Sequence, residues 1–154
     1  MQVIANLKAR RDREDGFTLI ELMVVVLIIA ILIAIAIPTF LGARERAQDR
    51  AAQSSLRNGL TAGKTIFTDN EDYTDADAAA LTLVEPSLTF GAASTGPTEL
   101  IVDNVSATVL VLGSLSKSGD CFWIRDDVQG SGTTYARVTG ACGATPAAAG
   151  FTGW

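Results

Sequence analysis

The chain has 154 residues, no histidine and only two cysteines. Histidine is the commonest general base and metal ligand near neutral pH, so its absence removes the usual centre of acid–base or metal chemistry. Two thiolates without an imidazole partner do not complete a four-ligand zinc site. No nucleophile stands beside a base, and no glycine-rich phosphate loop occurs. The sequence therefore predicts no catalytic site, no bound metal and no cofactor.

Positive charge is also scarce over most of the chain. The formal net charge is −5. The residues before Gly16 hold four bases and three acids, or +1, which leaves −6 for the remainder. An acidic remainder argues against direct binding to nucleic acid or to anionic lipid over a broad surface.

What the chain does have is one long apolar run. The 21 residues from Phe17 to Ile37 contain a single charge, Glu21, and a single hydroxyl, Thr18. A helix of about 20 apolar residues spans the roughly 30 Å hydrocarbon core of a bilayer. A carboxylate within such a segment is costly and marks function by default. The run therefore predicts a membrane-crossing helix in which Glu21 has a role.

Bases precede the run and predict its orientation. Within fifteen residues of it lie Lys8, Arg10, Arg11 and Arg13. Nearby Lys and Arg keep a terminus in the cytoplasm, so everything after Pro38 is expected on the far side. A cleaved secretory signal, with Ala34–Ala36 as the cleavage site, is one alternative, but its apolar region is shorter. A generic single-pass anchor is another alternative, but it would not explain why Glu21 is present.

The combination of a basic leader, Gly16, the residues Phe17-Thr18-Leu19-Ile20-Glu21-Leu22, a long apolar stretch and Pro38 resembles a type IV prepilin. Type IV pilins and type II secretion pseudopilins share this arrangement over about the first 45 residues. The resemblance implies that a membrane peptidase cuts between Gly16 and Phe17 and methylates the new amine of Phe17. It also implies that Glu21 meets that amine on a neighbouring subunit and sets the axial register of a filament.

The resemblance implies a division of the chain. Residues 1–16 form the leader peptide, 17–43 a hydrophobic transmembrane and polymerisation helix, and 44–154 an exported globular domain. The implied fold is α+β, the type IV pilin fold, in which a long N-terminal helix with a protruding first half packs on a small antiparallel sheet. Pro38 has no N–H and crowds the preceding turn, so it predicts a kink or loosened segment there. The family suggests that the helix unwinds at this point in the filament.

The helical pattern continues beyond Pro38 with an apolar face. It consists of Ala52, Leu56, Leu60, Gly63 and Phe67. Steps of three to four residues are typical of an amphipathic helix, which is expected to end near Thr68. Gly59 and Gly63 lower helix propensity, so they indicate either close packing or merely a looser helix. A short helix over 75–81 is expected next.

β-branched residues predict strands in the last third of the chain. The expected strands are residues 100–103, 107–112, 121–126 and 134–139. The last two flank the glycine-rich turn 128–133, which indicates a hairpin that brings Cys121 near Thr139. On an exported domain, Cys121 and Cys142 are expected to form a disulfide, and the loop it closes could contribute about 3 kcal/mol. Phe151 and Trp154 are expected to pack against the domain.

Five acids between Asp69 and Asp77 invite a calcium hypothesis, although they lack the glycine and terminal glutamate of an EF-hand. Helix-ending acids are more often simply solvated.

The resemblance implies that the chain is a structural subunit of a type IV pilus that serves adhesion, twitching motility or DNA uptake. Its expected partners are copies of itself, the prepilin peptidase and methyltransferase, and the assembly platform with its ATPase. The precursor is expected as a single-pass cytoplasmic-membrane protein and the assembled form at the cell surface. A pseudopilin of a type II secretion or competence system, and a membrane-anchored binding domain that does not polymerise, remain alternatives.

Overall fold

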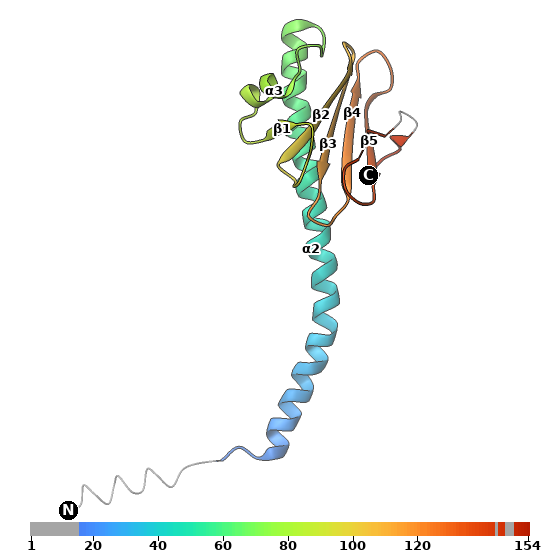
Figure 1. The fold of residues 1–154 in the computed structure, drawn as a ribbon. Helices are drawn as coiled ribbons and strands as arrows, with labels where there is room; N and C mark the ends of the chain where they lie inside the picture. Colours follow the sequence, from blue (N-terminus) through green and yellow to red (C-terminus); the bar gives the residue numbers. More distant parts are fainter. Residues whose placement is uncertain (1–15, 144, 147–149) are drawn as a thin grey trace, which may run out of the picture. The chain divides into compact units, whose positions relative to one another are not determined.

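The computed structural model describes residues 16–143, 145–146 and 150–154 (Figure 1). The predicted leader, apart from Gly16, lies outside the described residues. Two compact units divide the chain, one ending at Leu41 and the other running from Gly42 to Trp154. The secondary structure comprises two helices, α2 (Leu19–Asn70) and α3 (Ala78–Val84), and five strands in the described residues.

The helix α2 is one uninterrupted element of 52 residues. It ends two residues later than the sequence predicts. The Glu71 N–H donates to the Phe67 carbonyl at 2.8 Å, and Glu71 then takes a left-handed conformation with φ 61°. A residue in this conformation directs the chain away from the helix axis. The chain then reaches α3, whose N-cap is Asp77, with its carboxylate accepting the Ala80 N–H at 2.8 Å.

The strands form one sheet in the order β1 (Thr89–Gly91), β2 (Glu99–Ser106), β3 (Val109–Leu115), β4 (Cys121–Asp127) and β5 (Gly132–Val138). All neighbours are antiparallel except β1, which pairs parallel to β2. The sequence gives no sign of β1 because it has only three residues. The predicted final hairpin is present and pairs Cys121 with Val138, one residue from the expected Thr139. The predicted α+β fold, a long helix packed on a small, mostly antiparallel sheet, is confirmed.

The main core lies between α2 and one face of the sheet. The strands contribute Leu100, Leu110, Leu112, Phe122 and Ile124, and the helix contributes Ala52, Leu56, Leu60, Ala62 and Ile66. Alternate residues of β3 and β4 point the other way, since successive side chains of a strand face opposite sides. The single helix therefore covers only one face.

The two helix glycines belong to this core. A Cβ atom built on Gly59 would lie 2.5 Å from Cδ1 of Leu100, and one on Gly63 would lie 2.3 Å from Cδ2 of Leu110. Real Cβ atoms do not approach other atoms so closely. Of the two explanations offered by the sequence, close packing against the sheet is therefore the right one.

A second, smaller cluster covers the outer face of the sheet. It contains Ile101, Val109, Val111, Cys121, Trp123, Ala136 and Phe151. The C-terminal segment then passes round the β5 edge, where the Gly153 N–H donates to the Tyr135 carbonyl at 2.8 Å. Trp154 reaches the helix side, and its indole N–H donates to the carbonyls of Trp123 and Ala136 at 3.2 and 3.0 Å. The expected packing of Phe151 and Trp154 is present.

Candidate functional site

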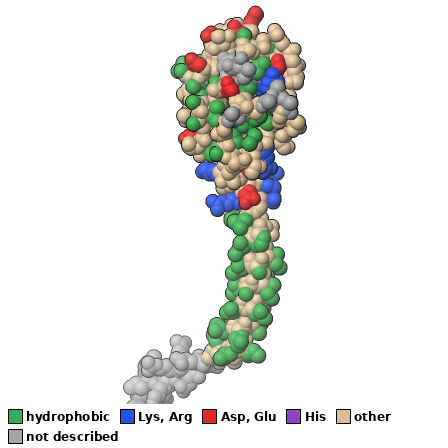
Figure 2. Space-filling model, turned by 45° about the vertical axis from the view of Figure 1, so that its right-hand side comes forward, with side chains coloured by type: hydrophobic (Ala, Val, Ile, Leu, Met, Phe, Trp, Pro, Cys, Tyr) green, Lys and Arg blue, Asp and Glu red, His purple; other side chains and the backbone are tan. Residues whose placement is uncertain are grey.

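The residues from Phe17 to Leu41 carry an exposed apolar surface on α2 and the turn before it (Figure 2). Their large hydrophobic side chains are 48–83% exposed. The helix is long and apolar enough to cross a membrane, with a mean hydropathy of 3.3 over its most apolar 18 residues and none of that window buried. Apolar surface on this scale marks contact with lipid or with another protein.

Glu21 sits at the start of this surface and is held by Thr18. The Glu21 N–H donates to Oγ1 of Thr18 at 3.3 Å, and that hydroxyl is 3.4 Å from Oε2 of Glu21. Thr18 is thus the N-cap of α2, and Glu21 is the third residue of the helix. This spacing is that of a capping box. The sequence carries the signal for this cap as Thr18-Leu19-Ile20-Glu21.

Gly16 and Phe17 precede the first helical residue, Leu19. Phe17 is 83% exposed. A Cβ atom on Gly16 would meet no atom within 4 Å, so packing does not require glycine at this position.

Pro38 lies within α2, and the helix continues on both sides of it. Proline cannot donate to the carbonyl four residues earlier, which here belongs to Ala34. At the next residue, the Thr39 hydroxyl donates to the Ile35 carbonyl at 3.1 Å. Unwinding of this segment in a filament stays a prediction.

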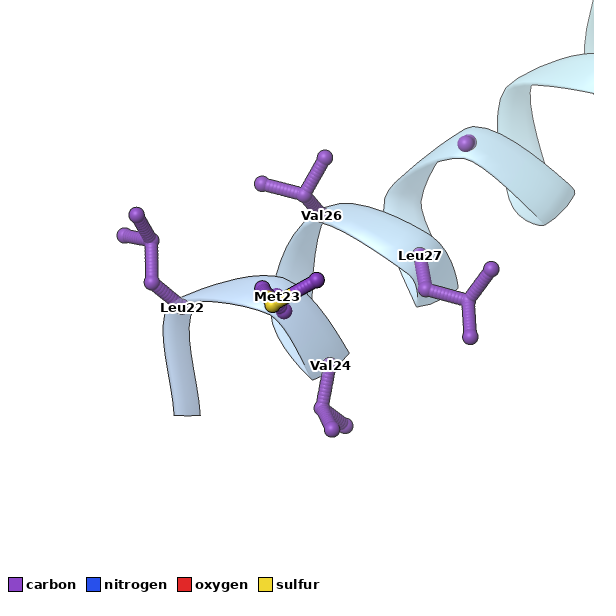
Figure 3. A pocket seen from close by; sticks show the side chains of 6 residues that line it. Leu22, Met23, Val24, Val26 and Leu27 are labelled. Atoms are coloured by element: carbon purple, nitrogen blue, oxygen red, sulfur yellow. The ribbon is translucent and has the colours of Figure 1, made fainter. Parts of the chain in front are cut away.

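The apolar surface has a shallow hollow near its start. Figure 3 shows its lining, which consists of Leu22, Met23, Val24, Val26, Leu27 and Ala30. The labelled side chains radiate in different directions from a single stretch of helix, and all of the lining residues are exposed. The hollow is therefore a part of a contact surface rather than an enclosed ligand site.

Cys121 and Cys142 form a disulfide, with Cα atoms 5.0 Å apart. Cys121 is fully buried and Cys142 packs against the outer cluster. The bond fastens the chain after β5 to the start of β4.

One buried carboxylate was not expected from the sequence, which places Asp126 only at the end of the expected strand 121–126. Asp126 is 3% exposed and accepts from the Tyr73 hydroxyl at 2.7 Å, the Thr133 hydroxyl at 2.6 Å and Lys64 Nζ at 3.0 Å. Burial acts to raise the pKa of Asp126, but these three donors outweigh it and hold the pKa below its usual value. Burial and the bond to this carboxylate raise the pKa of Tyr73. The network joins α2, the segment after it and the last hairpin, and its role is structural.

The acids of the calcium hypothesis are used within the chain. The Asp72 carboxylate accepts the Thr74 N–H, Asp75 accepts from Asn70, and Asp77 caps α3. Within the described ranges, no group of three or more His, Cys, Asp or Glu side chains is arranged to hold a metal ion.

Comparison with known proteins identifies the N-terminal pattern. Residues 11–37 match the prokaryotic N-terminal methylation motif. This motif is the signal of type IV prepilins and pseudopilins, a structural and non-enzymatic family, and it implies processing by a prepilin peptidase. No curated protein and no solved structure matches the chain. The motif and the apolar helix fit a membrane-anchored precursor. The chain therefore carries the type IV prepilin and pseudopilin signal, on an α+β architecture consistent with the type IV pilin fold.

Proposed function

We propose that this chain is the structural subunit of a type IV pilus. The observation that supports the proposal most directly is the methylation motif on the segment Phe17–Leu41, whose large apolar side chains are all exposed. A monomer in water would not leave such a surface uncovered. Lipid covers it in the precursor, and the same helix of neighbouring subunits covers it in the filament. Because both environments are apolar, transfer between them exposes little of this surface to water.

Processing is proposed to begin with a cut between Gly16 and Phe17 on the cytoplasmic side. Glycine at position 16 is not needed for packing, so its presence fits a requirement of the peptidase. Methylation then acts on the new amine of Phe17, which keeps its positive charge.

Glu21 is proposed to pair with that amine on a neighbouring subunit. A lone carboxylate deep in a bilayer costs about 3 kcal/mol on insertion scales. Removing an amine and a carboxylate from water together costs much less, provided that they meet. In the single chain the Glu21 side chain is exposed, and among the described residues its side-chain partner is the Thr18 hydroxyl at 3.4 Å, so it remains available to an incoming cation.

The proposal places the N-terminus in the cytoplasm, the Gly42–Trp154 unit on the far side and the finished filament at the cell surface. The assembly platform and its ATPase extract the subunits. A pseudopilin of a secretion or competence system would share the motif and the processing but form a short filament.

Two measurements test the proposal. Mass spectrometry of the mature chain should find N-methylphenylalanine derived from Phe17 as the first residue. Electron microscopy of cells that produce the chain should show long, abundant fibres that contain it, and Glu21→Gln should strongly reduce their yield. An intact leader together with the absence of fibres would support the non-polymerising anchor instead. Correct processing with only short fibres would favour the pseudopilin.

A further inference from the structure

The charges of the folded unit, Gly42–Trp154, are separated along α2. Residues 42–57 contain four arginines and two acids, whereas residues 69–77 contain five acids and no base. Figure 2 shows several Lys and Arg side chains, with an Asp or Glu side chain among them, at the end where α2 enters this unit, and Asp and Glu side chains over the rest of this face, including the opposite end. The charge therefore changes from mainly basic where α2 enters this unit to acidic where the helix ends.

The basic end is built from Arg44, Arg46 and Arg50, named here the arginine collar. All three side chains are exposed. Helical spacing puts Arg46 and Arg50 on one side of α2 and Arg44 on nearly the opposite side, so the charges surround the helix.

The collar lacks internal partners. In the described part of the chain, the salt bridges involve Lys64, Arg125 and Arg137, and none involves the collar. The nearby Asp49 carboxylate accepts instead from the hydroxyls of Ser116 and Ser118, at 2.8 and 2.5 Å. The collar is therefore free to bind an anionic group from outside.

The collar also opposes the orientation that the precursor needs. Bases just beyond a membrane segment on its exported side reduce the charge difference that orients it. Four bases lie before the apolar run and four arginines lie between 42 and 57, so the two sides are equal in number. A feature that weakens orientation in the precursor is expected to serve the assembled state.

The opposite end supplies the matching charge. The acidic end consists of Asp69, Glu71, Asp72, Asp75 and Asp77. Asp69 and Glu71 are exposed at the last turn of α2, where its carbonyl ends add to the negative potential.

We propose that the arginine collar of one subunit docks on the acidic end of a second copy of this chain. The inference rests on the proposed function, because subunits inserted with one orientation polymerise in parallel. In a parallel array, an axial offset between two copies brings opposite ends of their folded units together. From Arg46 in the collar to Asn70, the last residue of α2, the chain advances 24 residues, which corresponds to about 36 Å of helix at 1.5 Å per residue. The filament should therefore contain a neighbouring pair offset along its axis by about this distance.

Charge reversal in the full-length chain, expressed in cells that assemble it, tests the contact. Arg46→Glu/Arg50→Glu and, separately, Asp69→Lys/Glu71→Lys should each lower the fibre yield at least tenfold. Combining the two pairs should restore the yield to within about threefold of the parent. As a control, Glu85→Lys/Ser87→Lys adds positive charge outside both charged groups, raising the net charge by three against four for the acidic pair, and should not rescue the arginine variant. Processing at Gly16 and formation of the disulfide should remain normal in every variant.

The outcomes separate the two ideas. If the parent chain forms no fibres, the proposed function fails. If the parent assembles but both reversed variants assemble equally well, the docking inference is wrong while the filament remains. Loss of fibres without rescue by the combined reversal, or rescue by the control pair, would also overturn the inference.

Discussion

Replacing Gly59 by alanine tests the close packing of α2 on the sheet. The new Cβ would lie 2.5 Å from Cδ1 of Leu100, 3.1 Å from Cδ1 of Leu112 and 3.3 Å from Cε1 of Phe90. Leu100 and Leu112 are fully buried and Phe90 is 7% exposed, so these side chains have little room to move aside.

Two effects of opposite sign set the size of the change. Overpacking a core costs about 1–3 kcal/mol. Alanine regains about 1 kcal/mol of helix propensity relative to glycine. Because three side chains are crowded at once, we expect a net loss of about 1–2 kcal/mol in the free energy of unfolding. For a domain of this size each kcal/mol lowers Tm by about 4 °C.

The assay is thermal and denaturant unfolding of the detergent-solubilised full chain, followed by the fluorescence of buried Trp123. Gly42→Ala is the matched control, because Gly42 lies in the same helix and its Cβ would have only Arg46 Nη1 nearby, at 3.4 Å. The control should show no loss of stability. A Gly59→Ala variant as stable as the parent, or more stable, would refute the view that glycine is needed here for close approach.

Three further perturbations have defined outcomes. Tyr73→Phe removes a donor to Asp126, whose pKa is lower in the folded chain than the unfolded value of about 3.9. Above that value the charged carboxylate stabilises the folded chain, and this contribution is lost as the pH falls through the folded pKa. In an acid titration followed by circular dichroism, the variant should therefore unfold at a higher pH than the parent. Cys121→Ser/Cys142→Ser opens a loop with a sequence separation of 21 and should lower the free energy of unfolding by about 3 kcal/mol, measured by denaturant unfolding. An unchanged unfolding midpoint would contradict this. Trp154→Ala removes an aromatic side chain that makes two hydrogen bonds, and it should lower the free energy of unfolding by about 2 kcal/mol. The C-terminal segment of the variant should be cut faster by proteases. A segment as resistant as that of the parent would show that the Trp154 side chain is dispensable.

The sequence by itself determined the main elements of the fold. The apolar run and the periodic face up to Phe67 predict α2 almost to its end, because hydrophobic spacing is a local property of the chain. The strands β2 to β5 are long enough for their β-branched residues to predict them. The strand β1 could not be found in this way, because three residues carry no periodicity and its pairing with β2 depends on the rest of the sheet.

The residues of the candidate site could also be found largely from local features of the sequence. Glu21, the Gly16–Phe17 junction and Pro38 can be recognised in the sequence. Each differs in residue type from the apolar residues around or beside it, and no tertiary contact is needed to see that. The capping role of Thr18 was also visible as a four-residue pattern. Cys121 and Cys142 were expected to pair because only two cysteines exist.

Only the tertiary structure decided what depends on distant parts of the chain. It showed that the absence of a side chain at Gly59 makes room for Leu100, and that Asp126 is a buried carboxylate held by three donors. It also showed that no salt bridge within residues 16–143, 145–146 and 150–154 involves the arginine collar. The physical reason is the same in each case. Whether a group is buried, crowded or paired is a property of which surfaces meet, and one-dimensional spacing does not specify those contacts.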